Sequence, residues 1–146
     1  MADEQEMNDI ANEMQMHQSK GEIIRQQIQA MQSNILEISS TMDVLRNIKK
    51  ASKGDTLLPI GAGVMLACPK PDPSRVVVNV GANVMVEKKP EDALLMLEDR
   101  QKRIMKAVEE SQKNLQEVVQ AIEGLTKRAS LIAAEGGRGN VRPSEE

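Results

Sequence analysis

The side chains that most often carry out catalysis are scarce in this sequence, which has one His and one Cys among its 146 residues. His17 falls within a periodic run of apolar residues, where a packing or solvated role is favoured over a metal ligand or a base, because these need partners. Cys68 has neither a second Cys nor a nearby His, which favours an unreactive thiol. No Gly-rich stretch is followed by the Lys-Ser or Lys-Thr of a phosphate-binding loop. We therefore expect no catalytic residue, no metal and no cofactor, and a protein that is not an enzyme.

The composition excludes several other classes of protein. The chain has no Phe, Tyr or Trp, the residues that bury the most surface per side chain, so a self-contained globular core is not expected. A net charge of −3 leaves no broad basic surface for nucleic acid or anionic lipid. The start MADEQEMNDI is acidic and polar, unlike a secretion signal, and the stretch richest in apolar residues, 57–68, is too short to cross a membrane. These features predict a cytoplasmic protein that uses neither nucleic acid nor a membrane as a partner.

A short motif occurs twice, as PIGAGVML at 59–66 and as NVGANVMV at 79–86. Each copy centres on a three-residue connection, Gly61-Ala62-Gly63 or Gly81-Ala82-Asn83. The third residue of each connection tolerates the left-handed conformation used in three-residue hairpin loops. β-branched residues gather around these turns, as is typical of short strands. The repeat therefore predicts two β-hairpins.

The predicted hairpins pair 57–60 with 64–67 and 76–80 with 84–87, and three prolines keep the segment between them out of a ladder. A lone two-stranded hairpin is marginally stable in water. Four short strands with open edges and no aromatic side chain need neighbouring chains to complete a sheet or barrel. We predict that this middle segment is an assembly module. Its candidate residues are Gly61, Gly63, Val64, Val76, Val78, Val80, Gly81, Asn83, Val84 and Val86.

Two long segments flank the hairpins and carry a different period. A walk from Met7 to Leu45 in alternating steps of three and four meets an apolar residue at ten of twelve positions, and a walk from Leu94 to Ile132 does the same. This 3.5-residue period predicts a coiled-coil seam on each of two helices. Because the seams have equal lengths and are joined by a compact middle, we expect an antiparallel pair in which the numbers of facing residues sum to 139, as for Gly21 and Val118.

Residue types at the helix ends indicate the boundaries of these segments. Asp3 and Glu6 suit the start of the first helix, and Gly54 suits its stop. Pro90 suits the first turn of the second helix, and the glycine pair 136–137 suits its end. The predicted organisation is a coiled-coil helix at 1–54, a double β-hairpin assembly module at 55–89, a second coiled-coil helix at 90–135 and a disordered tail at 136–146.

The expected fold class is α+β, a long antiparallel two-helix coiled coil with two central β-hairpins that assemble into an oligomeric β-barrel. Two coiled-coil arms joined by paired hairpins, with the motifs PIGAGV and NVGANVMVEKKPEDAL, resemble the alpha subunit of archaeal prefoldin. The resemblance covers nearly the whole chain. Two hairpins between matched arms distinguish this subunit type from the single-hairpin beta type.

This resemblance implies a function and a set of partners. It implies a hexamer of two alpha and four beta subunits, with a double β-barrel body and six coiled-coil tentacles. Such a hexamer is a chaperone that holds unfolded proteins without ATP and passes them to a group II chaperonin. The alternative is a prefoldin-like structural protein that assembles through its hairpins into homo-oligomers or filaments and has no client role.

The free ends of the arms are the predicted client site. Off-seam apolar residues occur at Met16 and Ile23 on the first arm and at Val119 and Leu131 on the second. Flexible apolar side chains at such positions suit a surface that must accept many sequences. His17 and Gly21 interrupt the first seam, so we expect this end to open and expose seam residues. Packing of the off-seam residues on a neighbouring arm is the alternative explanation. The candidate client-binding residues are Met7, Ile10, Met14, Met16, Leu125, Ala129, Leu131 and Ile132.

Overall fold

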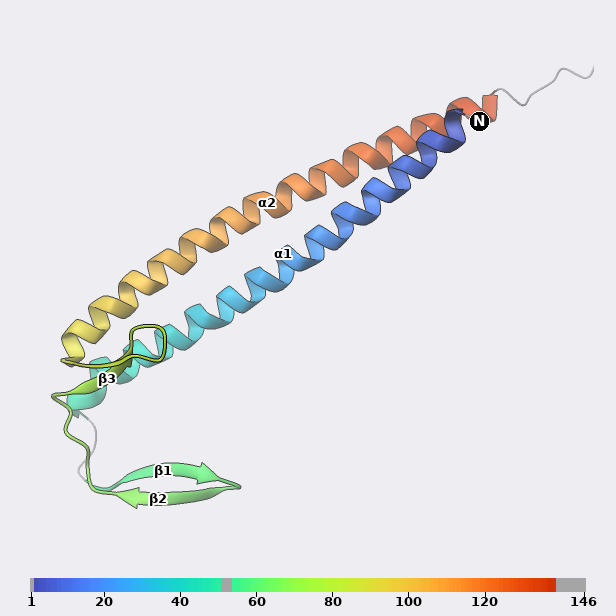
Figure 1. Ribbon diagram of the computed structural model, residues 1–146. Coiled ribbons are helices and arrows are strands. Elements are labelled where there is room, and N and C mark those ends of the chain that lie inside the picture. Colours follow the sequence, from blue (N-terminus) through green and yellow to red (C-terminus); the bar gives the residue numbers. More distant parts are fainter. Residues whose placement is uncertain (1, 51–53, 139–146) are drawn as a thin grey trace, which may run out of the picture. The chain divides into compact units, whose positions relative to one another are not determined.

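A computed structural model describes residues 2–50 and 54–138, so residues 139–146 of the predicted tail lie outside the described residues. Two antiparallel hairpins lie between two long helices in the chain, as predicted (Figure 1). The elements are α1 (Ala2–Asn47), the 3₁₀ turn η1 (Ile48–Lys50), β1 (Thr56–Gly61), β2 (Val64–Cys68), β3 (Val76–Asn79), β4 (Met85–Lys88) and α2 (Pro90–Arg138). They form two compact units, the terminal unit, Met1–Gln32 with Lys106–Glu146, and the hairpin unit, Ser33–Met105.

In the terminal unit, the α1 and α2 segments run antiparallel and pack along their predicted seams (Figure 1). Every seam position in this unit except Met7 is buried or half-buried. A Cβ atom built on Gly21 would lie 3.4 Å from Cγ1 of Val118, which agrees with the predicted pairing of these two residues. The most buried apolar side chains of this unit are Ile10, Ile24, Ile28, Val108 and Val118.

In the hairpin unit, the helix segments enclose a small apolar core. Ile38, Met42 and Leu97 form its buried centre, and Leu45 and Leu94 are among the half-buried side chains packed against it. The polar seam residue at 101 does not leave an unsatisfied amide there, because Nε2 of Gln101 donates a hydrogen bond of 2.8 Å to Oγ of Ser39. The seam therefore accommodates a polar side chain by pairing it with a hydroxyl on the opposite helix.

The start of α1 differs from its prediction. The helix already includes Ala2, which places Asp3 inside the first turn instead of at the cap. Glu6 does not complete a capping box, because its carboxylate accepts hydrogen bonds from the guanidinium of Arg128 on α2. An ion pair with the facing helix therefore replaces the predicted local cap.

The other helix ends are partly as predicted. α1 ends at Asn47, so Gly54, although its φ is +141°, is not the stop residue of that helix. Pro90 begins α2, and the carbonyl of Lys89 accepts the first helical hydrogen bond, 3.0 Å long, from the amide of Ala93. α2 then continues through the glycine pair 136–137 to Arg138, because neither glycine has the positive φ that ends a helix in a left-handed cap.

The hairpins form two separate two-stranded antiparallel sheets, β1–β2 and β3–β4. Leu58 faces Leu66 in the first sheet, and Val78 faces Val86 in the second. The first ladder extends to a pair between Gly61 and Val64 after an irregularity at residue 60. Its connection is thus one residue shorter than predicted, since the extra residue is taken up by the bulge.

Candidate functional site

Both hairpin turns hold a left-handed backbone at more positions than the sequence predicts. Gly63 and Asn83 have φ values of +78° and +58°, as expected for the third residue of each connection. Ala62 and Ala82 also have positive φ, +50° and +49°, and this was not predicted because alanine carries no turn signal. Two successive residues with positive φ are the requirement of a type I′ hairpin turn. The repeated motif therefore encodes the same turn twice.

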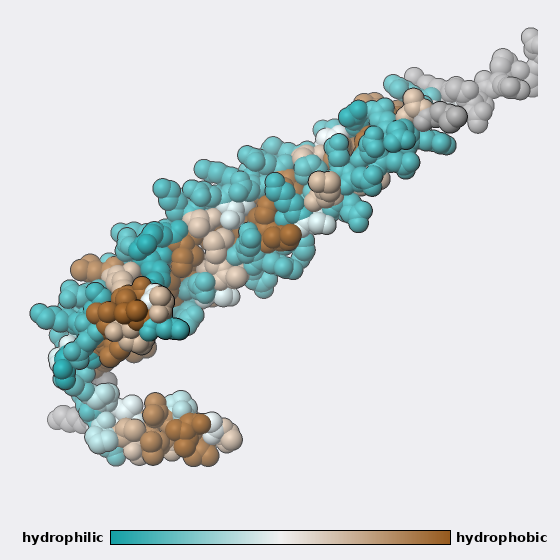
Figure 2. Space-filling model, in the orientation of Figure 1, coloured by the Kyte–Doolittle hydropathy of each residue, from teal (hydrophilic) through white to brown (hydrophobic). Residues whose placement is uncertain are grey.

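The β1–β2 hairpin exposes apolar side chains on both faces. Every residue of β1 is exposed, and on β2 only Cys68 is half-buried. Leu57 is 62 % exposed and Met65 is 54 % exposed, and Figure 2 shows apolar residues over this hairpin. Burial of apolar area is worth roughly 25 cal/mol per Å², so covering these faces would stabilise the hairpin.

The predicted assembly residues of the second hairpin divide between two environments. Val76 and Val78 alternate along β3 as its half-buried side chains. Val80, Val84 and Val86 are exposed. Period-two burial means that one face of β3 is already covered within this unit and that the other is open.

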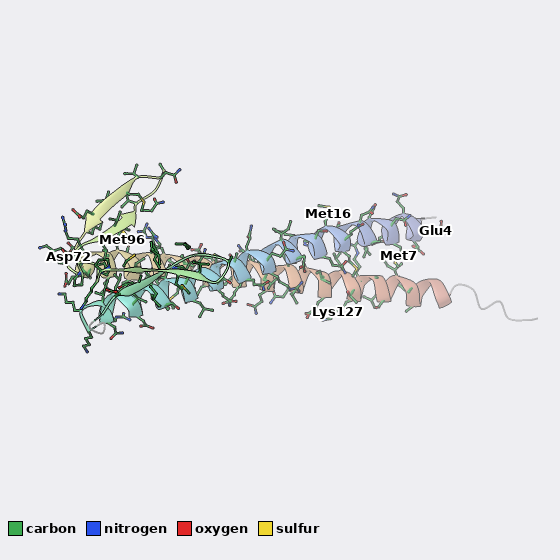
Figure 3. The ribbon with its side chains drawn as sticks, turned by 90° about the horizontal axis from the view of Figure 1, so that it is seen from below. Glu4, Met7, Met16, Asp72, Met96 and Lys127 are labelled. Carbon is green, nitrogen blue, oxygen red and sulfur yellow. The ribbon has the colours of Figure 1, made fainter. Side chains whose placement is uncertain are left out.

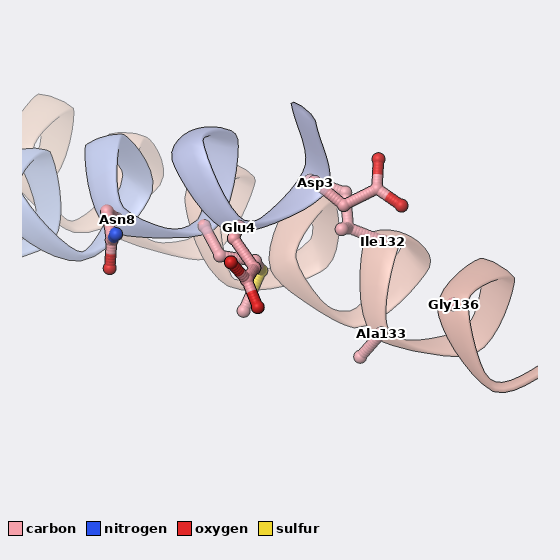
Figure 4. A pocket seen from close by; sticks show the side chains of 7 residues that line it. Asp3, Glu4, Asn8, Ile132, Ala133 and Gly136 are labelled. Carbon is pink, nitrogen blue, oxygen red and sulfur yellow. The ribbon is translucent and has the colours of Figure 1, made fainter. Parts of the chain in front are cut away.

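A hollow lies between the two helices near both ends of the chain (Figure 4). We call it the terminal hollow, and its volume is about 380 Å³. Met7 on α1 and Ile132 on α2 line it from opposite helices, and their numbers are those of one predicted seam layer. The residues lining it are Asp3, Glu4, Met7, Asn8, Ile132, Ala133 and Gly136.

The structure separates the predicted client-binding residues by exposure. Met16 is 73 % exposed and Leu131 is 65 % exposed, and in Figure 3 Met16 lies on the side of α1 away from α2. Ile10 is only 4 % exposed, because it packs in the seam. Any contact of a client with Ile10 therefore needs the helices to separate. The half-buried members are Met14, Leu125, Ala129 and Ile132.

A second depression, the α1 groove, runs along α1 beside Met16 and has a volume of about 950 Å³. Ile23 lines it one heptad after Met16 and is also exposed. The off-seam position of Ile23 indicated client contact, as for Met16, although Ile23 is not among the eight candidate client-binding residues. The residues lining the groove are Asn12, Glu13, Gln15, Met16, His17, Ser19, Lys20, Ile23, Ile24 and Gln27.

Charged side chains link the helices in each unit. In the terminal unit, Nε of Arg128 donates a hydrogen bond of 3.0 Å to Glu6, and a second guanidinium nitrogen donates to the same oxygen. In the hairpin unit, the ammonium of Lys49 donates a hydrogen bond of 2.9 Å to Glu91, which lowers the pKa of this carboxyl group. Opposite charge and hydrogen bonding both favour the ionised carboxylate.

The segment between the hairpins is held by a local turn. The hydroxyl and the backbone amide of Ser74 both donate to Oδ1 of Asp72, at 2.6 and 2.9 Å. These bonds, with a smaller contribution from Arg75, lower the pKa of Asp72. The arrangement is an Asx turn, which redirects the chain between the two hairpins.

The two residues with catalytic potential belong to different units. His17 lines the α1 groove, whereas Cys68 ends β2 in the other unit. Among residues 2–50 and 54–138, no group of three or more His, Cys, Asp or Glu side chains is placed to hold a metal ion. Neither α1 nor α2 has an uninterrupted apolar stretch suited to cross a membrane, within the part of the chain that the structure describes.

The order helix, two hairpins, helix is also that of a known protein family. Residues 17–135 match the family model described as prefoldin subunit. The chain belongs to the prefoldin family. Prefoldins are non-enzymatic chaperones, and so this chain is a prefoldin-type chaperone subunit at the level of its family.

Several relatives of this prefoldin chain are alpha subunits from archaea. The chain is 30 % identical to prefoldin subunit alpha of Methanococcoides burtonii over 136 residues, which are 92 % of this chain and 94 % of the relative. It is 29 % identical to the Pyrococcus horikoshii alpha subunit over 129 residues, 87 % of each chain. These matches confirm the resemblance to the archaeal alpha subunit.

A solved structure has the same fold. The filamentous PFD of Methanocaldococcus jannaschii, determined by cryo-EM, superimposes with a TM-score of 0.72 at 22 % sequence identity. The superposition covers 82 % of this prefoldin chain and 99 % of the other chain. The predicted fold class of two helices and two central hairpins is thereby confirmed.

Proposed function

We propose that this chain is the alpha subunit of an ATP-independent holdase, which binds unfolded proteins at the ends of its coiled-coil arms and delivers them to a group II chaperonin. It acts in the cytoplasm as part of a hexamer with two alpha and four beta subunits. The observation that carries the proposal is the apolar surface left open in the terminal unit, at Met16, Leu131 and the terminal hollow.

The physical basis is the adaptability and the number of these sites. Methionine and aliphatic side chains repack against many different apolar sequences. Each arm offers a small surface and holds a client weakly. Several arms joined in one complex raise the effective concentration of binding sites for a client that reaches more than one arm. A hexamer therefore holds an unfolded chain more firmly than one subunit does, without an energy source.

Assembly is assigned to the hairpins. The β1–β2 hairpin has two uncovered apolar faces, and the β3–β4 hairpin has one. Strands from beta subunits would cover these faces and pair the open edges, closing the hairpins into a barrel.

The test of the client site replaces Met14, Met16, Leu131 and Ile132 with Ser in the complex with beta subunits. Suppression of aggregation of a chemically denatured protein, measured by light scattering, should weaken, while the native mass of the complex stays unchanged. Met14 and Ile132 are half-buried in the seam, so their replacement could also loosen the helix pair. A second variant therefore carries only Met16→Ser and Leu131→Ser, which leave the seam intact.

A matched control for the double variant uses two apolar side chains of similar exposure in the hairpin unit, Leu36 and Leu95. Their replacement with Ser should leave aggregation suppression intact if the site lies in the terminal unit. Equal loss in both variants, or unchanged activity in the first, would reject this location and favour the barrel cavity or the partner arms.

A filament-forming structural subunit is the second candidate, and the filamentous PFD of Methanocaldococcus jannaschii is the observation that favours it. Native mass measurement of this chain, alone and mixed with its cell's beta-type subunit, separates the two. A hexamer formed only on mixing supports the holdase. Long homo-oligomers of the chain alone, with no suppression of aggregation in either sample, support the structural candidate.

A further inference from the structure

The terminal hollow has an apolar lining and an acidic border. Met7 and Ile132 form apolar walls from the two helices, and the small residues Ala133 and Gly136 leave room between them. Asp3 and Glu4 line the same hollow from the first turn of α1, and Figure 4 shows them with the other labelled lining residues. The site thus presents apolar surface and carboxylates within reach of one bound segment.

The two border carboxylates have no cationic partner among the side chains that the structure describes. Arg128 on the facing helix is paired with Glu6. Residues 1–19 contain five acidic side chains and no Lys or Arg. Lys127, the residue before Arg128 on α2, does not line the hollow. Among the described side chains, the two border carboxylates are therefore not paired with a cation.

The dipole of α1 offsets only part of this charge. The amino end of a helix carries about half of an elementary positive charge, whereas Asp3 and Glu4 together contribute two negative charges at neutral pH. Asp3, Glu4 and the dipole together therefore leave net negative charge at the hollow, which favours a cationic group in whatever binds there.

We propose that the terminal hollow selects unfolded segments in which an apolar side chain adjoins Lys or Arg. This inference rests on the proposed holdase function and specifies the clients of that same site. The apolar side chain enters between Met7 and Ile132, and the aliphatic stem of the neighbouring Lys or Arg covers the rim while its charged head reaches Asp3 or Glu4. An acidic segment of equal hydrophobicity is repelled by the same carboxylates.

The test measures the binding of labelled unstructured peptides to the full chain, alone and in its complex, by fluorescence anisotropy. Three peptides share one aliphatic core and differ in their flanks, which are Lys, Ser or Glu. We expect the Lys-flanked peptide to bind about tenfold more tightly than the Glu-flanked peptide at 0.1 M salt. The preference should shrink at 1 M salt, where the Debye length falls from about 10 Å to about 3 Å.

Charge variants locate the effect. Asp3→Asn with Glu4→Gln should reduce the preference to less than about twofold and leave the Ser-flanked peptide unaffected. Glu109→Gln with Glu110→Gln removes the same charge from exposed positions elsewhere in the terminal unit and should keep the preference. Ile132→Ser should weaken all three peptides. Circular dichroism of each variant checks that the helices are retained.

The outcomes separate this inference from the holdase proposal. Equal binding of the Lys-flanked and Glu-flanked peptides by the unmodified chain overturns the charge selection but leaves a holdase in place. If the Glu109/Glu110 variant loses the preference for Lys-flanked peptides, the preference comes from diffuse charge on the arm. That result would also reject the terminal hollow as its source. If the chain self-associates and Ile132→Ser abolishes this association, the occupant of the terminal hollow is a second copy of the chain. No peptide binding together with no aggregation suppression rejects both proposals.

Discussion

Ala62 and Ala82 occupy a backbone region that is unfavourable for a residue with a Cβ atom. Their φ values of +50° and +49° are followed by +78° at Gly63 and +58° at Asn83. A left-handed conformation costs an L-residue roughly 1–2 kcal/mol. Both turns therefore hold an alanine in a strained backbone conformation.

Replacement of the turn residues should change hairpin stability in opposite directions. Ala62→Gly and Ala82→Gly relieve the left-handed strain and should stabilise the hairpins by up to about 1 kcal/mol each. Gly63→Val and Asn83→Val should destabilise them by about 1 kcal/mol or more each and reduce complex formation. Native mass titration with the beta subunit measures the effect, and circular dichroism should show retained helix. An unchanged complex in the Val variants would contradict the assignment of assembly to the hairpins.

Glycines within the terminal unit limit the stability of its helices. A Cβ atom on Gly124 would meet no atom within 4 Å, whereas a Cβ atom on Gly21 would lie 3.4 Å from Val118 and 3.8 Å from Leu115. Gly124→Ala should raise the free energy of unfolding by up to about 1 kcal/mol. Gly21→Ala should raise it by less, because its methyl group must fit against Val118. Thermal unfolding followed by circular dichroism measures both.

The same variants test whether clients bind by opening the seam. If Ile10 and Met14 contact clients only after the helices separate, Gly124→Ala should weaken aggregation suppression as it stabilises the arm. Ala30→Gly, at an exposed position of α1 in this unit, should have the opposite effects on stability and on client binding. A change in stability without any change in holdase activity would indicate that the closed surface is sufficient.

The ion pair between Lys49 and Glu91 makes a pH-dependent contribution to the stability of the folded chain. Lys49 lowers the pKa of Glu91 in the folded chain, so its contribution to stability is present above the unfolded value of about 4.3. It is lost as the pH falls through the lower folded value. Glu91→Gln should therefore lower the melting temperature at pH 7, and the difference from the unmodified chain should vanish in acid. Asp92→Asn is the control, because it removes a carboxylate from the same first turn for which no ion pair is found among the described side chains.

The register of α1 against α2 in the terminal unit is tested by cross-linking. Ile24 and Leu115 flank Gly21 and Val118 in the predicted layers, so cysteines at these two positions should form a disulfide within one chain. The background carries Cys68→Ser to remove the native thiol. Cysteines at Ile24 and Val108 are two turns out of this register and should remain reduced. Oxidation followed by non-reducing electrophoresis and mass measurement distinguishes the two, and preferred coupling to Val108 would reject the register.

For the chain as a whole, stability and assembly should be inseparable. The hairpins expose apolar faces, and the helices enclose narrow cores without aromatic side chains. Binding of a partner to the folded chain stabilises it by mass action. The melting temperature of the mixture with beta subunits should therefore rise with protein concentration, and Gly63→Val with Asn83→Val should flatten this dependence. A melting temperature that is independent of concentration in the unmodified mixture would show that the hairpins gain no stability from partners.

The helices, their seams and the two turns were predictable because each is encoded by neighbouring residues. A 3.5-residue apolar period specifies which face of a helix is buried, and it correctly placed Ile24 and Val118 in the seam. Glycine and asparagine identified the left-handed turn positions at Gly63 and Asn83. The exposure of Met16 also follows from its place off the seam.

Contacts between distant residues required the folded chain. The sequence assigned Glu6 to a local cap, but its carboxylate pairs with Arg128, 122 positions away, because the antiparallel register places these side chains together. The same register forms the terminal hollow from residues near opposite ends of the chain and leaves Asp3 at its border. It also buries Ile10, a predicted contact residue. Local periodicity decides which side chains face the opposite helix, whereas the pairing of individual charges and the hollows between side chains depend on which residues meet there.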